Sequence, residues 1–330
     1  MIVVTGAYGC LGSNVVRALL ERGERVVALR REGESAASLA DVAGDVEDVV
    51  VDIRDADGTD RALRGRTGLF HLAGVAVMTN KAARAMHEVN VVGTAHVMSA
   101  ARRHGLRTVH TSSASAVGFP APGVTADEDH PYRADRRRNA YQHTKRAGER
   151  IVLGEVARGL DAVVLNPAGV IAPGGDGRSA WPGLVARVAA GRFPLSPPGG
   201  FSFVAAEEFR AAQLAAYDKG AAGRRYIVAT EYLRYHELFA RIAQRTGARA
   251  PRGTVPSPVL RALAIASAPI NAWIGSPERA LLMSSENLPM LTGELRYSPR
   301  RCRTELGVEP GDMNRALDDV VAWCRRHRYI

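Results

Sequence analysis

The sequence predicts an α/β fold in which a doubly wound parallel sheet is followed by a smaller, helix-rich C-terminal lobe. Over the first half of the chain, short apolar runs rich in β-branched residues alternate with segments of helical periodicity, a pattern typical of parallel sheets. Beyond residue 166, loop-forming glycines and prolines become frequent and the apolar segments mostly show helical spacing. We therefore expect one domain at residues 1–166, completed by part of 201–228, and a second lobe at 167–330.

The first element is a buried strand at residues 2–4 that runs into a glycine-rich turn. Gly6, Gly9 and Gly12 follow at intervals of three, and an apolar pattern of helical spacing then continues to Gly23. Such glycines let the backbone turn tightly and approach a pyrophosphate, which the free N–H groups of the helix N-terminus then bind. The alternative is a tight turn without a ligand, but the flanking strand and helix favour a dinucleotide site.

A second strand is expected at residues 25–29, and it ends at Arg30 and Arg31 without an acidic residue. A carboxylate at this position binds the ribose 2′-hydroxyl of NAD, whereas arginine suits the 2′-phosphate of NADP. The alternative is that both arginines belong to the general arginine excess of the chain. The sequence favours NADP(H), with NAD(H) as the other option.

The remaining elements follow in order along the chain. Strands are expected at 47–51, 69–72, 108–111, 162–165 and 226–228, and helices at 82–103, 140–158, 180–190, 206–217, 235–244, 259–266 and 314–325. His71 lies within an apolar strand, so we interpret it as a packed, hydrogen-bonded histidine and not as a catalyst or ligand.

Tyr141 and Lys145 are four residues apart on the expected 140–158 helix and therefore share one face. A lysine ammonium beside a phenol lowers the tyrosine pKa, which suits tyrosine to proton transfer near neutral pH. Ser113, at the end of the fifth strand, is placed to hydrogen-bond a substrate carbonyl, and Ser115 in the same loop is the alternative donor. Any helix can carry this spacing, but Lys145 is one of only three lysines in the chain.

Charge and cysteine content exclude several other classes of protein. The net charge is +10, but the 44 basic residues are scattered, unlike a nucleic-acid-binding stripe. Cys10, Cys302 and Cys324 are odd in number and lack metal-ligand spacing, so neither a disulfide framework nor a metal site is expected. The apolar segment 255–274 is broken by prolines and does not predict a membrane span. With no leader expected before the first strand, a reducing cytoplasm is the simplest compartment.

Six motifs occur in a characteristic order. They are Thr5-Gly-x-x-Gly-x-x-Gly12, Asp52-Ile53, His71-Leu-Ala-Gly74, Asn90-Val-Val-Gly-Thr94, Thr111-Ser-Ser113 and Tyr141-x-x-x-Lys145. Together they resemble the extended (atypical) short-chain dehydrogenase/reductase family, within the NAD-dependent epimerase/dehydratase superfamily. Residues 166–173, 201–204, 223–227 and 305–323 are most similar to its dihydroflavonol-reductase-like branch, which also contains hydroxysteroid-dehydrogenase-like reductases.

The resemblance implies a Rossmann fold and a set of residue roles. Tyr141 is implied to donate the proton, Lys145 to lower the tyrosine pKa and bind the nicotinamide ribose, and Ser113 to polarise the carbonyl. The residues expected at the cofactor are Gly6, Tyr8, Gly9, Cys10, Leu11, Gly12, Arg30, Arg31, Asp52, Ile53, Leu72, Ala73, Gly74, Thr111, Ser112, Tyr141, Lys145, Pro167, Gly169 and Val170.

Departures from the family pattern bear on the substrate. Nucleotide-sugar epimerases and dehydratases usually carry Tyr-Gly-Pro after the sixth strand and Arg-Asp-Phe later, where this chain has Ile-Ala-Pro at 171–173 and Gly-Phe-Ser at 200–202. The arginine that grips a nucleotide diphosphate is therefore missing. An acidic pair, Glu207 and Glu208, stands where the branch more often has aspartates.

The resemblance and the missing arginine together imply an NADP(H)-dependent reductase that acts on a ketone or aldehyde of a small-to-medium, apolar metabolite. One alternative is an NAD-dependent nucleotide-sugar epimerase or dehydratase. Another is a non-catalytic dinucleotide-binding protein. A homodimer is one option for the assembly.

Apolar residues of the second lobe are candidates for lining a substrate pocket. Two groups are expected to face inward: Val259, Leu260, Leu263 and Ala264, then Ile270, Trp273 and Ile274. The simpler interpretation is that they only pack the small lobe against the large one. Small-molecule pockets are also mostly apolar, which supports a role for these residues in lining a substrate pocket.

Overall fold

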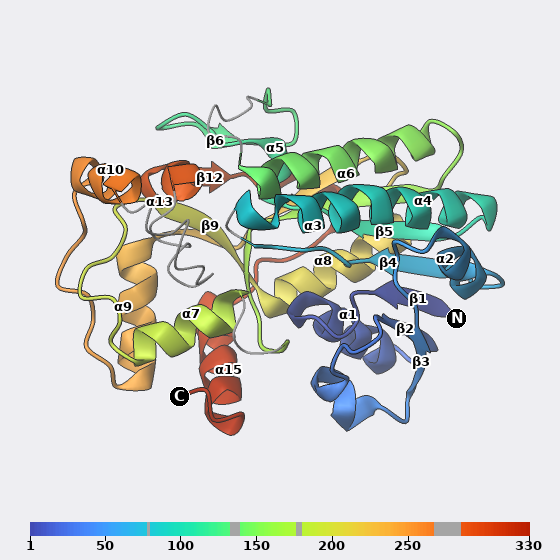
Figure 1. The fold of residues 1–330 in the computed structure, drawn as a ribbon, viewed down its shortest axis with the longest axis horizontal. Coiled ribbons are helices and arrows are strands. Elements are labelled where there is room, and N and C mark those ends of the chain that lie inside the picture. Colours follow the sequence, from blue (N-terminus) through green and yellow to red (C-terminus); the bar gives the residue numbers. More distant parts are fainter. Residues whose placement is uncertain (78–79, 133–138, 176–179, 267–284) are drawn as a thin grey trace.

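A seven-stranded parallel sheet forms the centre of the first domain (Figure 1). The computed structural model describes residues 1–77, 80–132, 139–175, 180–266 and 285–330. The strands are β1 (Ile2–Thr5), β2 (Val26–Arg30), β3 (Val46–Val50), β4 (Gly68–His71), β5 (Arg107–Thr111), β7 (Ala162–Pro167) and β10 (Arg225–Val228). They lie in the order β10-β7-β5-β4-β1-β2-β3. This order reverses between β1 and β4, and doubly wound sheets bind ligands at such a point. The α/β fold class is confirmed.

Helices cover both faces of this sheet (Figure 1). Two helices, α1 (Cys10–Glu21) and α8 (Ala206–Lys219), pack on one face. Another three, α2 (Ala56–Leu63), α4 (Thr94–Arg103) and α6 (Ala140–Val156), pack on the other. Side chains alternate between the two faces along each strand. Thus Ile2 and Val4 join the α1/α8 core, while Val3 joins the opposite one.

The helix expected at 82–103 is interrupted by a widened turn. A 3₁₀ turn η2 (Asn80–Ala82) and helix α3 (Ala83–His87) lead into a π-helical segment η3 (Glu88–Gly93) before α4 begins. Within η3, the Asn90 amide donates to the Val75 carbonyl (3.0 Å) and accepts from the Val75 N–H (2.8 Å). Wide turns of this kind are frequent at functional sites. The prediction of one regular α-helix was wrong here because this side-chain bonding is not visible in apolar spacing.

A second sheet lies in the other half of the molecule, where a helix-rich lobe was expected. Its strands are β11 (Glu231–Arg234), β9 (Gly200–Ala205), β12 (Glu294–Tyr297) and β6 (Thr125–Ala126), in that order, and β8 (Gly169–Ile171) pairs with β9. Helices α7 (Ala180–Ala189), α9 (Tyr235–Thr246) and α15 (Met313–Arg326) cover it with an apolar core. The lobe is rich in helices, as predicted, but it also contains a small sheet that the sequence did not reveal. The strands are two to six residues long and pair over long sequence separations, so periodicity gave little signal.

The acidic pair at the start of α8 joins this helix to the C-terminal segment. Glu207 accepts a hydrogen bond from the Asp312 N–H (2.6 Å), and Glu208 accepts one from the Gly311 N–H (3.0 Å). Glu208 also binds the Thr230 hydroxyl. The chain thus uses glutamates to hold the loop that precedes α15.

The apolar group expected around residue 260 divides between two environments. In α10 (Ser257–Ala266), Leu260 and Ala264 pack against helix α13 (Leu288–Thr292). Val259 and Leu263, by contrast, are 47% and 45% exposed. The prediction that they face inward was wrong. Neighbouring positions on a helix point about 100° apart, so only one of the two apolar stripes can face the core. Ile270, Trp273 and Ile274 lie outside the described residues.

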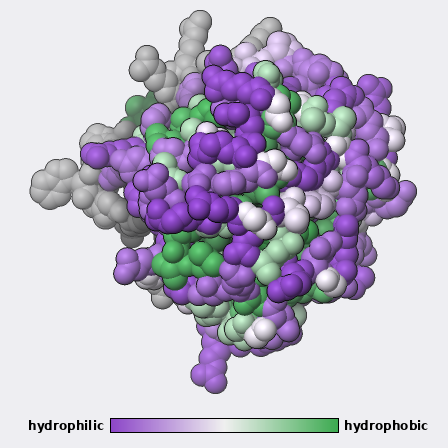
Figure 2. All heavy atoms as spheres, turned by 90° about the vertical axis from the view of Figure 1, so that its right-hand side faces the viewer, coloured by the Kyte–Doolittle hydropathy of each residue, from purple (hydrophilic) through white to green (hydrophobic). Residues whose placement is uncertain are grey.

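The remaining short helices are α5 (Ala114–Val117), α14 (Arg300–Leu306) and the 3₁₀ turns η1 (Ala37–Val42) and η4 (Ser285–Asn287). The face of the molecule that carries the β3 edge and α2 is mostly hydrophilic, with apolar atoms in separate groups (Figure 2). Across the described ranges, no helix has the length and apolar character needed to cross a bilayer.

Candidate active site

The predicted site residues come together along one edge of the first sheet. Gly6 to Gly12 follow β1, Arg31 follows β2, Asp52 and Ile53 follow β3, and Leu72 to Gly74 follow β4. Thr111 ends β5, Ser112 and Ser113 follow it, and Pro167 ends β7. The carboxyl ends of parallel strands share one edge. The sheet therefore gathers residues that are far apart in the sequence.

The glycine-rich turn after β1 packs directly against the chain leaving β4. Gly6 has φ +65°, and a Cβ atom there would lie 2.8 Å from the Ala73 nitrogen. A Cβ atom on Gly12 would lie 1.9 Å from the Gly6 carbonyl oxygen. The first turn of α1 contains no acidic side chain, and a helix N-terminus attracts anions. A close backbone cradle at a helix N-terminus fits the pyrophosphate of a dinucleotide.

Arg30 forms an ion pair with another residue of the protein. Its guanidinium binds Asp48 (2.7 Å between Nη2 and Oδ2), and the Tyr8 hydroxyl donates to the same carboxylate (2.9 Å). The guanidinium holds the pKa of Asp48 below its ordinary value, while burial and the bond to Asp48 raise the pKa of Tyr8 to about 12. These contacts tie the glycine-rich turn to β2 and β3.

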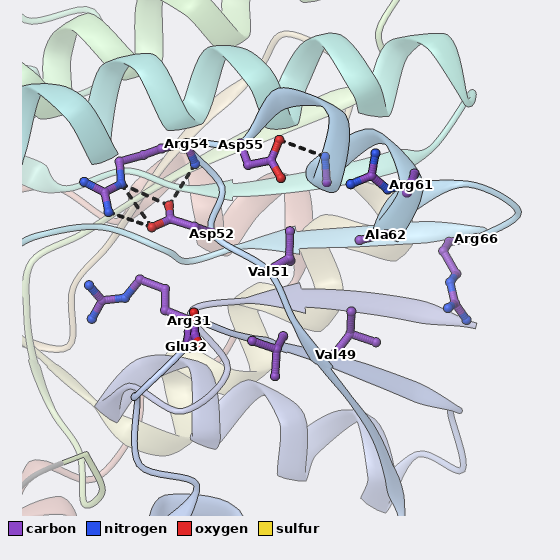
Figure 3. Close-up of a pocket in the computed structure, with 12 residues that line it drawn as sticks. Arg31, Glu32, Val49, Val51, Asp52, Arg54, Asp55, Arg61, Ala62 and Arg66 are labelled. Carbon is purple, nitrogen blue, oxygen red and sulfur yellow. Dashed lines mark hydrogen bonds and ion pairs between the residues drawn. The ribbon is translucent and has the colours of Figure 1, made fainter.

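Arg31 lies in a more open place. Its side chain is 58% exposed, and its charge lies 3.7 Å from Glu34. Together with Asp52 and Arg54 it borders a cavity of about 720 Å³ with an apolar floor that includes Val51. Figure 3 shows the Arg31 and Arg54 side chains extending to the same side, with Asp52 between them. Arg54 binds Asp52 (2.7 Å), so Arg31 is the less constrained of these two cations.

Ser113, Tyr141 and Lys145 meet beside the end of β5. The Ser113 side chain caps α5 by accepting from the Ser115 N–H (3.2 Å), and it also lowers the pKa of the Tyr141 phenol. Of the two serines considered, Ser113 is thus the one that acts on the tyrosine. The Lys145 ammonium donates to the Thr111 carbonyl oxygen (2.8 Å).

The electrostatics of this group differ from the expectation. Burial raises the pKa of Tyr141 above its ordinary value, although Ser113 opposes this. The lowering expected from Lys145 is not found: burial of the phenol has the largest effect, and Ser113 is the group that opposes it. Burial also lowers the pKa of Lys145 to about 8, against the attraction of Glu149. At neutral pH the site holds a protonated phenol beside an ammonium group.

His71 plays the structural part that was expected. Its Nδ1 lies 2.7 Å from Thr5 Oγ1 and its Nε2 lies 3.1 Å from Thr94 Oγ1. Thr5 Oγ1 also accepts from the Ala73 N–H (3.1 Å), which suits the tautomer with its proton on Nε2. Burial lowers the pKa of His71 to about 3. The interpretation of a neutral, packed histidine is confirmed.

Several residues expected at the cofactor are buried and bind other parts of the protein. The Thr111 hydroxyl accepts from Gln213 (2.8 Å), and the Ser112 hydroxyl donates to Glu149 (2.9 Å). Pro167 and Val170 are buried as well. These residues form the wall of the site, so their side chains support it more than they contact a ligand.

Glu149 is a site residue that sequence reasoning missed. It lies one helical turn beyond Lys145 on the same face of α6, and it is fully buried. Its Oε2 accepts from Ser112 and from Asn166 (2.7 Å), and its Oε1 lies 2.7 Å from the Arg225 guanidinium. A glutamate in line with Tyr141 and Lys145 on a buried face was the available signal, because charged residues are seldom buried without a role.

Comparison with known proteins agrees with this geometry. The profile of the NAD dependent epimerase/dehydratase family matches residues 2–230. Sterol demethylase protein B of Methylococcus capsulatus is 35% identical over 99% of both chains. The 2-alkyl-3-oxoalkanoate reductase of Stenotrophomonas maltophilia is 30% identical over 75% of this chain and 76% of its own. The crystal structure of gox2253 superposes with a TM-score of 0.86 and 28% identity, over 100% of this chain and 99% of the other. The chain belongs to the NAD-dependent epimerase/dehydratase family and is an NAD(P)-dependent oxidoreductase of the extended short-chain dehydrogenase/reductase type.

Proposed function

We propose that this chain is an NADP(H)-dependent carbonyl reductase that acts on a ketone or aldehyde of a small-to-medium, apolar metabolite. The observation that carries the proposal is the meeting of Ser113, Tyr141 and Lys145 beside a turn shaped for a dinucleotide. The raised pKa of Tyr141 keeps its phenol protonated at neutral pH. A protonated phenol is the form that can give a proton to a carbonyl oxygen.

The residues divide the work of the reduction. Ser113 and the phenol of Tyr141 hydrogen-bond the carbonyl oxygen and orient the substrate. A bound nicotinamide supplies the hydride to the carbonyl carbon. Tyr141 then transfers its proton to the oxygen, and the Lys145 ammonium stabilises the phenolate that remains. The family resemblance implies that Lys145 also binds the nicotinamide ribose.

Arg31 supports a preference for NADP(H). It stands at the end of β2, where the adenosine ribose lies in dinucleotide folds, and its charge is only loosely paired. Arg30 points to Asp48 instead, so we assign the 2′-phosphate contact to Arg31 alone. Arg30 then acts indirectly, because it fixes Tyr8 and the glycine-rich turn.

Two observations support an apolar substrate. Gly200 stands where nucleotide-sugar enzymes of this family usually carry the diphosphate-binding arginine, and the next residue, Phe201, is buried against Phe203 and Tyr297. The two curated relatives described above are named for a sterol and for an alkyl-substituted keto acid. Both compounds present a carbonyl or hydroxyl group on a largely apolar body.

The proposal is tested by following NADPH absorbance with a panel of hydrophobic ketones and aldehydes. We expect net NADPH consumption with at least one of them, and weaker activity with NADH. Calorimetric titration with UDP- and dTDP-sugars is the companion measurement. Micromolar binding of a nucleotide sugar, together with a cofactor that is retained and not consumed, would replace the reductase by an epimerase or dehydratase.

A further inference from the structure

Glu149 connects parts of the site that come from four different elements. Its carboxylate accepts hydrogen bonds from Ser112 after β5 (2.9 Å) and from Asn166 in β7 (2.7 Å). It also binds Arg225 in β10 (2.7 Å) and lies 3.4 Å from Arg146 in its own helix α6. A carboxylate with this many partners satisfies the requirement for burying a charge.

Two of these partners bear directly on the reacting groups. Ser112 precedes Ser113, so the bond to Glu149 fixes the turn from which Ser113 acts on Tyr141. Asn166 also links Glu149 to this turn, since its amide donates to the Ser113 carbonyl oxygen as well (3.0 Å). The orientation of Ser113 therefore depends on a carboxylate that never touches the substrate.

The charge of Glu149 also acts on Lys145. Within the described part of the chain, it is the anion whose attraction opposes the lowering of the Lys145 pKa by burial. His71 in β4 and His110 in β5 also face Lys145, but both are buried and neutral. Tyr141 on α6 is protonated. Without Glu149, the Lys145 ammonium would lose this attraction, while the two histidines and Tyr141 beside it remain neutral.

We propose that Glu149 is a positioning residue for the reduction, whose carboxylate fixes the Ser112–Ser113 turn and keeps the Lys145 ammonium protonated. This inference rests on the proposed role of Lys145 in turnover, but its first consequence can be measured without a substrate. The substitution Glu149→Gln preserves the shape of the side chain and removes the charge.

The direct measurement is an NMR titration of lysine side chains. The chain has only three lysines, Lys81, Lys145 and Lys219, so protein labelled with ¹³C-lysine gives three Cε signals. The Lys145 signal is the one absent from Lys145→Arg. In the wild type we expect it to titrate with a pKa of about 8. In Glu149→Gln we expect this pKa to fall by about one to three pH units, the range typical of a lost neighbouring charge.

Glu155→Gln is the matched control. Glu155 lies on the same helix, is also nearly buried, and pairs with Arg102 and Arg158 on the outer side of α6. It should leave the Lys145 titration unchanged. If Glu149→Gln does not fold, Arg225→Gln is the alternative test, and it should shift the Lys145 pKa in the opposite direction. Without the Arg225 cation, the Glu149 carboxylate attracts the Lys145 ammonium more strongly, so the Lys145 pKa should rise. An unchanged Lys145 pKa in every folded variant of Glu149 and Arg225 would overturn the proposal.

Turnover of a hydrophobic ketone supplies the second readout. In Glu149→Gln, the alkaline limb of the kcat profile should move to lower pH together with the Lys145 pKa. A purely structural loss would lower kcat equally at all pH values, and this result would also overturn the proposal. If no ketone is reduced but the NMR shift is seen, the proposed function fails and the effect of Glu149 on Lys145 stands.

Discussion

The Tyr141 phenol has a raised pKa and is influenced by Ser113, so its hydroxyl is the group whose loss should matter most. Tyr141→Phe retains the ring and removes only the proton donor. We expect turnover to fall about 10²–10⁴-fold, the usual contribution of general acid catalysis, while the dissociation constant for NADPH changes little. Steady-state kinetics and fluorescence titration of NADPH measure the two effects.

Tyr217→Phe is the control for that substitution. Tyr217 stacks on Phe70 on the α8 side of the sheet, with 5.2 Å between ring centroids. Its phenol lies outside the site, so turnover should remain near the wild-type value. Near-wild-type turnover in Tyr141→Phe would show that another group donates the proton.

Arg31 and Arg30 are neighbours in sequence but should differ in their effect on cofactor binding. Arg31→Ala should weaken NADPH binding at least about tenfold and leave NADH binding nearly unchanged, because a charge-assisted contact to phosphate contributes about 1.5–3 kcal/mol. Arg30→Ala should weaken both cofactors alike, since it releases Asp48 and Tyr8. Calorimetry with both cofactors separates the two patterns. Equal affinity of the wild type for NADH and NADPH contradicts the assignment.

At the scale of elements, the turn between β1 and α1 leaves no room for a side chain at Gly12. Gly12→Ala places a methyl group 1.9 Å from a backbone oxygen, so the turn must move away from the chain after β4. We expect loss of measurable NADPH binding and destabilisation by about 2 kcal/mol or more, as for overpacked cores. Urea denaturation and NADPH fluorescence measure both.

The matched control is Gly154→Ala in α6. A Cβ atom there meets nothing within 4 Å, and alanine is favoured over glycine within a helix by about 0.5–1 kcal/mol. This variant should be slightly more stable than the wild type and bind NADPH normally. If Gly12→Ala behaves in the same way, the close approach of the turn is not required.

Sequence patterns predicted the first sheet well because most of its strands are buried and are separated by helical segments. The strands β1, β2, β4 and β7 therefore appear as compact apolar runs; the edge strand β3 is more exposed. The strands of the second sheet are shorter, and β9 pairs with β8, β11 and β12 across 30 to 90 residues. Pairing over such separations leaves no local pattern, so this sheet was missed.

The same distinction applies to the candidate site. Ser113, Tyr141 and Lys145 could be predicted because helical spacing and the end of a strand place them together. Helical spacing also puts Glu149 in line with them, but the roles of Asp48 and Glu149 could not be predicted, because these roles depend on partners from other elements. Only the folded chain shows that Asp48 occupies Arg30, or that Glu149 lies behind Lys145.

For the whole molecule, stability should fall as the solution becomes mildly acidic. Burial holds the pKa of His71 at about 3, so the folded protein keeps it neutral at pH 5 while the unfolded chain protonates it below about 6.5. The unfolded state then binds more protons, so the free energy of unfolding decreases as pH falls. From pH 7 to 5 this amounts to about 2 kcal/mol for His71, and His110 acts in the same direction.

Urea denaturation at pH 7, 6 and 5 checks this expectation. Between pH 7 and 5, the free energy of unfolding of His71→Gln should fall by about 2 kcal/mol less than that of the wild type. His327→Gln is the control, since His327 is exposed near the C-terminus and should leave the pH dependence unchanged. A wild-type stability that is constant between pH 7 and 5 would contradict the assignment of two neutral buried histidines.

The placement of β10 and α8 has a consequence for synthesis of the chain. The outer strand of the first sheet is β10, and α8 covers Phe70 and Val163, yet both elements follow β8 and β9 of the second sheet in sequence. A ribosome therefore releases six strands of the first sheet before the element that closes its edge. During that interval β7 has an open edge, and the part of the sheet face that α8 later covers remains exposed. The nucleotide-binding half thus reaches its final packing only after β8 and β9 of the other half have been synthesised.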